Sequence, residues 1–345
     1  MGCYIKKVGL PRALIYYKFA ELWETFFKEL GAEVIISPQT NKIIREKAIR
    51  AAPDEDCYST KLYFGHALTI ANDVDYLFIP RFGSKHKTNV GCPKFIGLAD
   101  VLRSMYPNLP KLIMPYYSKA KSKHGIRKLL QHAISIGLIF TKNPFKIAKA
   151  IIKAFSSYKK HYKNLLLSPD TLKKWEQSQI KLIEDEVALT SNEPPLKIAL
   201  VGHSYVINDS FASFDIRKKL KGHNIDYITS EQMPKKIIEK EMTKLDFNLY
   251  FDFEREILGT IMYFLDSKTV DGIIQIMVFG CGPDSIAGEM ASRFAKRKPN
   301  VQLLQLVIDD LTAEAGFQTR IDAFIDMLQR RRTKNAVHIS PLRIT

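Results

Sequence analysis

The chain has 345 residues, of which 46% are hydrophobic, and it carries a formal net charge of +16. This length exceeds one ordinary hydrophobic core, so we expect two domains of about 150 residues each. No apolar run approaches the roughly 20 residues of a membrane span, and the first residues lack the pattern of a signal peptide, so we expect a cytoplasmic protein.

The first part of the chain predicts strands that alternate with helices. The predicted strands cover Ile5–Leu10, Glu33–Ser37, Val74–Pro80 and Lys111–Tyr117. The predicted helices cover Arg12–Leu30, Lys42–Arg50 and Tyr58–Ala71, and Gly31 stands at the usual cap position of the first. Strands separated by helices of this length predict a parallel sheet with helices on both faces.

A basic segment then interrupts the alternation. Ser118 to Lys163 contains twelve Lys or Arg residues and no acidic residue. We expect helices over Gly125–Tyr162, with a break at Asn143-Pro144, and over Pro169–Leu189, before the linker "TSNEPPL". The positive charge belongs to a solvated helical face, or the segment binds nucleic acid, an anionic membrane surface or a phosphate-rich ligand.

The last part of the chain restarts the alternation and predicts a second lobe. The strands cover Lys197–Gly202, Ile225–Ser230, Val270–Phe279 and Val301–Asp309, and the helix Phe317–Arg332 follows. Four stretches match the first part in the same order, at offsets of 189 to 196 residues. The matches indicate either a repeated unit or two α/β units that share common patterns. We expect an α/β fold of two Rossmann-like, doubly wound lobes, at residues 1–117 and 193–345, with the basic helical insert and linker at 118–192 between them.

Three of the four cysteines follow predicted strands or precede predicted helices. Cys281 lies in "FGCGPDS", directly after a buried strand, and Cys92 lies in the similar "VGCPKF". Cys57 immediately precedes the helix that starts at Tyr58. Ligands of parallel α/β sheets collect beyond the carboxyl ends of the strands, and helix N-termini offer N–H donors to sulfide or thiolate. Inert buried thiols, reactive thiols and a metal or cluster site all stay open.

Convergence of these cysteines from both lobes would suit one iron–sulfur cluster. Structural zinc usually takes four ligands with closely spaced pairs, and the chain contains no C-x-x-C pair. A [4Fe–4S] cluster on three thiolates would leave one iron for water, hydroxide or substrate. Because Cys57 has no counterpart near Phe251, we expect that iron to face the second lobe.

Several long stretches resemble one known superfamily. They include "VGLPRALIYYKFAELWETFFKELGAEVIISPQTNK", "DEDCYSTKLYFGHA", "VDYLFIPRF", "CPKFIGLADVLR", "GHSYVIND" and "TRIDAFIDML". The chain resembles the 2-hydroxyacyl-CoA dehydratase and benzoyl-CoA reductase superfamily, in particular its activase-related, D-component-like branch. The resemblance implies two Rossmann-like lobes and a [4Fe–4S] cluster held by Cys57, Cys92 and Cys281. It also implies low-potential electrons delivered by an ATP-hydrolysing activator protein.

The same resemblance makes Glu55 and His66 candidate catalytic residues that handle protons near the cluster. A helix cap for Glu55 and a structural hydrogen-bonded role for His66 are the alternatives. Arg81 and Lys94 would balance cluster or phosphate charge or lie on a solvated face, and His203 is a further candidate for the crevice. Two features depart from the family: Ser59 replaces a frequent proline, and four cysteines are too few for a double cubane, whether or not Cys3 takes part.

These observations predict an iron–sulfur redox protein that acts on a small molecule such as an acyl-CoA. The alternative is a non-catalytic, cluster-bearing partner or electron-transfer scaffold, in which the basic insert docks an acidic activator. We do not expect nucleic acid to be the partner, because the insert's aromatic residues keep the helical spacing of a core or interface; these are Phe140, Phe145, Phe155, Tyr158 and Tyr162. No P-loop pattern is present, so we do not expect the chain itself to be the ATPase. Homodimer and heterodimer stay open.

Overall fold

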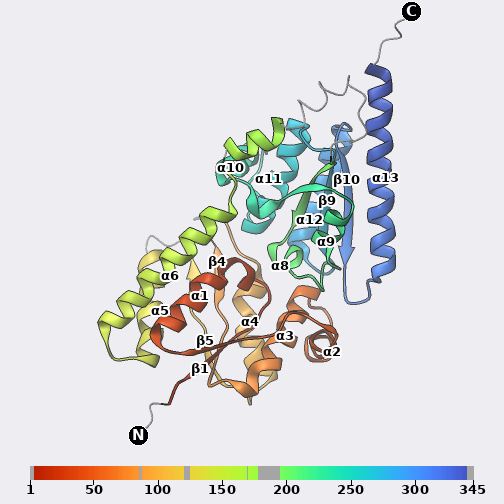
Figure 1. Ribbon diagram of the computed structural model, residues 1–345. Helices are drawn as coiled ribbons and strands as arrows, with labels where there is room; N and C mark the ends of the chain where they lie inside the picture. Colours follow the sequence, from red (N-terminus) through yellow and green to blue (C-terminus); the bar gives the residue numbers. More distant parts are fainter. Residues whose placement is uncertain (1–3, 85–87, 120–124, 169, 178–194, 340–345) are drawn as a thin grey trace, which may run out of the picture.

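The computed structural model describes residues 4–84, 88–119, 125–168, 170–177 and 195–339. It is an α/β protein with two four-stranded parallel sheets, which lie in two lobes (Figure 1). The first lobe contains β1 Lys7–Leu10, α1 Tyr16–Leu30, β2 Glu33–Ile36, α2 Lys42–Ala51, α3 Tyr58–Ile70, β3 Tyr76–Phe78, β4 Arg81–Ser84, α4 Pro93–Met105, β5 Lys111–Ile113 and β6 Tyr116–Ser118. The insert contains α5 Gly125–Phe140 and α6 Pro144–Leu165. The second lobe contains β7 Lys197–Gly202, α8 Ser204–Ile207, α9 Ile216–Gly222, β8 Asp226–Thr229, α10 Lys235–Met242, α11 Asp252–Ser267, β9 Gly272–Val278, α12 Gly282–Arg297, β10 Gln302–Ile308 and α13 Glu314–Ile339.

The two main sheets have the same strand order. In the first the order is β2-β1-β3-β5, and in the second, from the other edge, it is β8-β7-β9-β10. All neighbouring strands are parallel, with Val8 opposite Val34 in the first sheet and Ile198 opposite Tyr227 in the second. The strands correspond one to one, which agrees with a repeated unit. The predicted fold class, two Rossmann-like lobes with parallel sheets, is confirmed.

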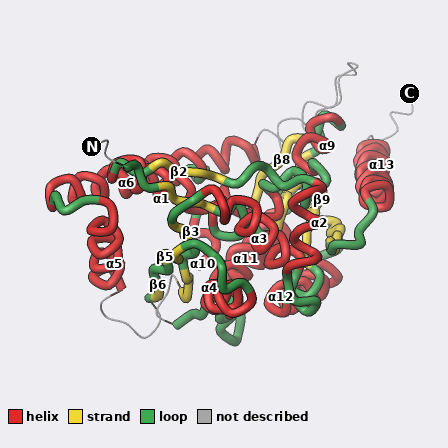
Figure 2. The backbone as a smooth tube through the Cα atoms, turned by 90° about the horizontal axis from the view of Figure 1, so that it is seen from below, coloured by secondary structure: helices red, strands yellow, loops and turns green. Residues whose placement is uncertain are grey.

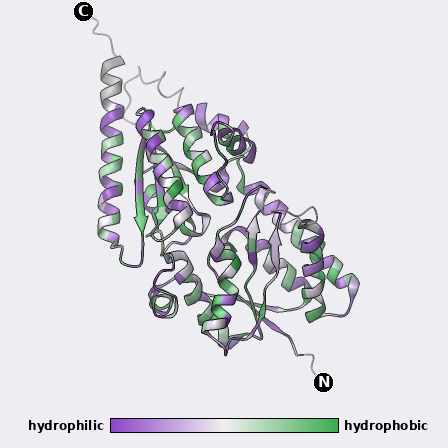
Figure 3. Ribbon diagram, turned by 180° about the vertical axis from the view of Figure 1, so that it is seen from behind, coloured by the Kyte–Doolittle hydropathy of each residue, from purple (hydrophilic) through white to green (hydrophobic). Residues whose placement is uncertain are grey.

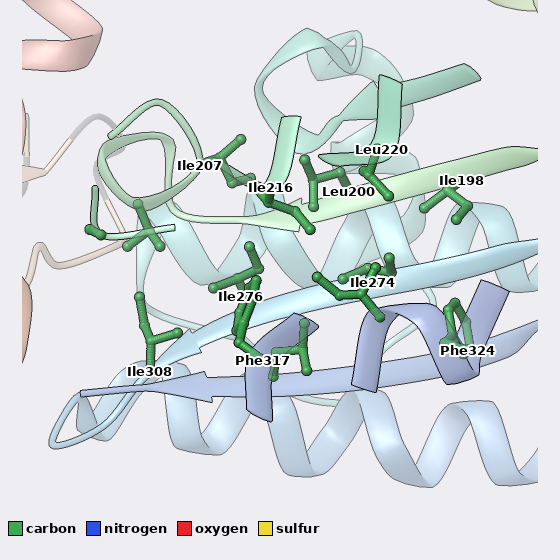
Figure 4. Packing of buried hydrophobic residues seen from close by; sticks show 14 of the residues in the cluster. Ile198, Leu200, Ile207, Ile216, Leu220, Ile274, Ile276, Ile308, Phe317 and Phe324 are labelled. Atoms are coloured by element: carbon green, nitrogen blue, oxygen red, sulfur yellow. The ribbon is translucent and has the colours of Figure 1, made fainter. Parts of the chain in front are cut away.

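The second sheet forms from nearly continuous apolar strands because it is covered on both faces. Every residue of β7 is buried, and Ile274 and Ile276 of β9 are fully buried. Phe317 and Phe324 of α13 pack on these strands (Figure 4). Viewed from behind, the strands are hydrophobic while α13 beside them alternates between hydrophilic and hydrophobic residues (Figure 3).

The basic insert forms two helices, which the sequence predicts, and its second helix packs on the first lobe. Asn143 caps α6, because its side-chain oxygen accepts hydrogen bonds from the backbone N–H groups of Phe145 and Lys146. Phe19 of α1 stacks on Tyr158 of α6 with ring centroids 5.5 Å apart. Helices α5 and α13 lie at opposite ends of the molecule (Figure 2).

The aromatic residues of the insert divide between packed and exposed positions. Phe140 packs edge-on against Phe27, and Tyr158 stacks on Tyr162. Phe145 and Phe155 are exposed. The packed residues fit the expected core or interface role.

The structure differs from the expected elements in three places, and two of these differences have local physical reasons. The predicted strand Lys111–Tyr117 divides into β5 and β6, because Pro115 has no N–H to continue the ladder; β6 pairs instead with β4. The first helix starts at Tyr16, four residues later than predicted, because Leu14 has a φ of 51° and lies outside helical geometry. Helices α10 and α11 were not predicted from the sequence.

The predicted domain boundaries stay a prediction. Strand β6 ends at Ser118, one residue past the first boundary. The second boundary, at residue 192, lies outside the described residues, as does most of the predicted helix Pro169–Leu189; residues 170–177 of it are helical.

Direct polar contacts join the two lobes. Lys18 of α1 donates to Glu256 of α11 at 2.7 Å, and the Lys18 ammonium lies 4.6 Å from the ring centroid of Phe253. The backbone N–H of Val90 donates to the carbonyl oxygen of Tyr250 at 2.8 Å. These contacts bring the start of α11 next to the loop that leads to Cys92.

Candidate metal centre

All three candidate cysteines are the capping residues at helix N-termini. Cys57 precedes α3, Cys92 precedes α4, and Cys281 precedes α12. Proline stands in the first turn of α4 and of α12, where it costs no intrahelical hydrogen bond. The sequence-based placement of each thiol at the start of a helix is therefore what the structure shows.

The structure brings these cysteines together from the two lobes. A Cβ atom added to Gly280 would lie only 3.4 Å from the Cα atom of Cys57, so the residue before Cys281 touches the first lobe. Cys57 packs against the same hydrophobic cluster that contains Cys281. The charge of Cys57 acts on the pKa values of both Cys92 and Cys281. Cys57 and Cys281 therefore lie near one another where the two lobes meet, and Cys92 lies within electrostatic range of Cys57.

Burial favours the neutral, protonated form of the Cys92 and Cys281 thiols. It raises the pKa of Cys92 to about 11, although the backbone N–H groups of Lys94 and Phe95 act in the opposite direction. Burial, together with the nearby Asp284, raises the pKa of Cys281 far above its usual range. Activated nucleophilic cysteines have lowered pKa values, so neither thiol fits that role, whereas binding a metal would displace their protons.

A group of buried polar side chains from the second lobe faces the cysteines. His203 follows β7, Glu254 lies in the first turn of α11, and Asp284 lies in the first turn of α12. Their exposed fractions are 2%, 3% and 0%. One ligand atom from each of His203, Glu254 and Cys281 lies within 4.8 Å of the others. The expectation that an open iron faces the second lobe stays a prediction; the side chains on that side are buried.

These polar groups have unsatisfied hydrogen-bonding capacity. Neither ring nitrogen of His203 has a hydrogen-bond partner, nor does the Oδ1 atom of Asp284; its Oδ2 atom accepts from the backbone N–H of Val278 at 2.8 Å. Buried polar groups in native proteins are nearly always paired, and exceptions call for a missing ion, water or functional role.

Burial also shifts the pKa of each acidic or basic group in this set toward its neutral form. It raises the pKa of Glu254 to about 8 and that of Asp284 to about 7. It lowers the pKa of His203 to about 3, and the positive charge of Lys18 acts in the same direction. The protein alone therefore presents a largely uncharged set of potential ligands.

The candidate catalytic residues lie outside this set. Glu55 is exposed; its neighbour Asp56 is the buried acid and forms an ion pair with Lys94, which links the Cys57 and Cys92 loops. Lys94 thus has a protein partner, as does Arg81, which pairs with Asp100. Proton transfer by Glu55 stays a prediction.

His66 is fully buried and both of its ring nitrogens have partners. Nδ1 lies 2.8 Å from the hydroxyl of Ser37, and Nε2 lies 2.9 Å from the hydroxyl of Thr40. Thr40 in turn donates to Asp209 of the second lobe. The catalytic role of His66 also stays a prediction. Cys3 lies outside the described residues.

The donor set fits a metal centre. Thiolates and imidazole are the groups that bind zinc, iron and iron–sulfur clusters, and buried unpaired donors are expected where a metal completes the site. The molecule is thus a two-lobed α/β protein with a candidate thiolate–histidine metal centre between its lobes.

Comparison with protein families identifies the chain. Residues 7–233 match the family described as "CoA enzyme activase uncharacterised domain", and the chain belongs to that family. The resemblance to the activase-related branch is confirmed. No curated protein matches the chain.

A solved structure is similar only in broad outline. It is a crystal structure of a candidate sugar-binding protein from Salmonella typhimurium LT2, with 9% sequence identity over 88% of this chain and 81% of that chain, and a TM-score of 0.23. A likeness of this size supports no functional argument. Within the described ranges, no helix combines the length and apolar character needed to cross a membrane.

Proposed function

We propose that the protein is a cytoplasmic iron–sulfur redox protein. It would bind a [4Fe–4S] cluster through Cys57, Cys92 and Cys281, accept low-potential electrons from an ATP-hydrolysing activator and pass them to a small molecule such as an acyl-CoA. The observation that supports the proposal is that all three cysteines stand at helix N-termini, with Cys57 of the first lobe next to the turn of the second lobe that presents Cys281. Membership of a CoA enzyme activase-related family supports it.

The protein's own part in this function is to hold and shield the centre. A bound [4Fe–4S] cluster would supply one-electron redox chemistry. Helix N-termini beside the three thiolates would stabilise their negative charge. The ring of Tyr205, which is partly buried and packs against the hydrophobic cluster that contains Cys281, would help to keep water away.

The test is an anaerobic metal and sulfide analysis after reconstitution. We expect close to four irons and four sulfides per chain, as the cluster formula requires, and loss of most of them in Cys57→Ser, Cys92→Ser and Cys281→Ser. Cys3→Ser is the matched control and should keep the cluster. Iron below one atom per chain, or iron that is unaffected by all three substitutions, would refute the proposal.

A second candidate is a non-catalytic electron-transfer partner, and the enclosure of the centre favours it. The side toward the second lobe is filled by buried side chains. A small hollow of about 40 Å³ beside α11, well below the size of ligand pockets, is lined by four carboxyl groups and two cations. Such a lining does not favour a polyanion such as CoA.

Stoichiometric electron transfer distinguishes the two candidates. The protein would be reduced once by the activator and ATP, then mixed with acyl-CoA compounds without further reductant. Reoxidation with matching product formation supports the enzyme. Reoxidation only by a second protein, with no change to any acyl-CoA, supports the electron-transfer partner.

A further inference from the structure

Among the polar side chains of the site, His203 is the one whose burial is least compensated by contacts within the protein. Its imidazole stacks on Tyr205, with centroids 4.7 Å apart and ring planes 8° apart, and Phe253 meets it edge-on at 6.1 Å. A neutral imidazole has one donor and one acceptor nitrogen. Both nitrogens are buried without a hydrogen-bond partner, and leaving such a group unpaired is destabilising.

The distances around its Nε2 atom are those of co-ligands rather than of hydrogen bonds. Nε2 lies 3.7 Å from Oε1 of Glu254 and 3.8 Å from Oδ2 of Asp284. Hydrogen bonds between such atoms require about 2.7–3.2 Å. Two nitrogen and oxygen ligands on one tetrahedral metal, each about 2.0–2.2 Å from it, lie roughly 3.4 Å apart. A shift of a few tenths of an ångström therefore brings Nε2 and Oε1 to one metal atom.

The ring is also held where a ligand is needed. Tyr205, which fixes its plane, lies close enough to Cys57, Cys281 and Glu254 to be affected by their charges. Glu254 acts on both Cys92 and Cys281 in the same way. His203 and Glu254 thus stand beside Cys281, since one ligand atom from each of the three lies within 4.8 Å of the others.

We propose that His203 is a metal ligand through Nε2, the fourth protein ligand of the centre formed by Cys57, Cys92 and Cys281, with the Glu254 carboxyl beside the same metal position. The identity of the metal as iron rests on the proposed function. With this position filled by the protein, the centre transfers electrons without binding substrate at that iron. This favours the electron-transfer role over substrate activation.

Pulsed EPR of the reduced, iron-reconstituted protein tests the ligand directly. Histidine bound to iron gives a strong ¹⁴N coupling, which changes in a defined way when histidine is labelled with ¹⁵N. We expect this coupling in the native protein and in His223→Ala, whose exposed ring pairs with Asp322 on the second lobe. We expect its loss in His203→Gln, which has a similar shape.

Further variants keep the test valid if the histidine substitution disturbs folding. His203→Cys supplies a thiolate at the same place and should restore cluster content without the nitrogen coupling. Glu254→Gln should keep the coupling, since it removes only the neighbouring carboxylate. Circular dichroism confirms that each variant is folded before its spectrum is read.

The outcomes separate this inference from the proposed function. A full cluster without ¹⁴N coupling, whose signal broadens in ¹⁷O-labelled water, overturns the His203 assignment and leaves the iron–sulfur function standing. A single zinc or iron without sulfide, with nitrogen ligation lost in His203→Gln, refutes the cluster and retains the ligand. Absence of any bound metal refutes both.

Discussion

Gly280 of the second lobe lies against Cys57 of the first, with 3.4 Å between an added Cβ and the Cys57 Cα atom. Gly280 also has a φ of 79°, in the left-handed region that favours glycine. The turn that presents Cys281 therefore depends on a residue without a side chain, for both the backbone conformation and the fit between lobes.

Gly280→Ala should destabilise the protein and lower its metal content. The left-handed conformation costs a residue with a Cβ roughly 1–2 kcal/mol, while the new methyl group would be in ordinary van der Waals contact with Cys57. Urea unfolding and iron analysis measure the two effects. Gly282→Ala is the matched control, because nothing lies within 4 Å of its added Cβ; equal losses in both variants would contradict the explanation.

The ion pair between Lys18 and Glu256 should contribute measurably to the contact between lobes. Its side chains are 8% and 23% exposed, so water screens it less than a surface pair. We expect Lys18→Met to lower the free energy of unfolding by roughly 1–3 kcal/mol. Most of this decrease should be absent when Lys18→Met is introduced into a protein that already carries Glu256→Gln. The exposed pair of Lys28 and Glu24 should show coupling of about 0.5 kcal/mol or less in the same double-mutant cycle. A similar small coupling for both pairs would argue against a role in joining the lobes.

The metal-free protein should lose stability through Glu254 as the pH rises. Burial raises its pKa to about 8, while an unfolded glutamate titrates near about 4.3. Between these two pH values the folded state thus keeps a proton on Glu254 that the unfolded state has lost. The contribution of this group to stability is complete at low pH and lost as the pH approaches 8.

Glu254→Gln should remove this part of the pH dependence. The free energy of unfolding is compared between variants at several pH values, because buried His66 and His203, whose pKa values are lowered, act with the opposite sign. Relative to the native protein, Glu254→Gln should gain stability from about pH 5 to about pH 8. Glu289→Gln, at an exposed site whose pKa is lowered by Arg293, should show no such gain, and a constant difference for Glu254→Gln would disprove the assignment.

His66→Ala should destabilise the fold rather than empty the metal centre. The substitution removes the ring as a hydrogen-bond partner of the Ser37 and Thr40 hydroxyls, at a cost of roughly 0.5–1.5 kcal/mol for each lost hydrogen bond; Ser37 keeps its bond from the Arg12 N–H and Thr40 keeps its bond to Asp209. Glu55→Gln, at an exposed position, should change stability by no more than about 0.5 kcal/mol. If His66→Ala abolishes turnover while unfolding at the same urea concentration as the native protein, the catalytic role predicted by resemblance is the correct one.

The sequence predicted the elements that depend on local patterns. The apolar run Val270–Phe279 identifies β9, and the Cys-Pro and Gly-Pro dipeptides near Cys92 and Cys281 mark helix starts because proline suits the first turn. The repeat was visible because each lobe has the same order of strands and turns. These signals place all three cysteines correctly at helix N-termini.

The remaining part of the site depends on how the lobes meet, and no local pattern reports that. Glu254 lies in the run "FDFEREIL", which carries an ordinary amphipathic pattern, and its carboxyl is buried 3.7 Å from His203, a residue distant in the sequence. Asp284 reads as a helix-start acid, whereas its burial comes from contact with the end of β9. The histidine in "GHSYVIND" was a candidate, but its lack of partners is a property of three-dimensional packing.

The N-termini of four helices meet at this centre: α3, α4 and α12 carry the cysteines, and α11 carries Glu254. Each helix start is equivalent to about half a positive elementary charge, so together they amount to roughly two charges placed by the backbone alone. Substituting side chains leaves that field in place. The backbone therefore makes a positive contribution to the potential at this site, and that contribution does not depend on the cysteine side chains.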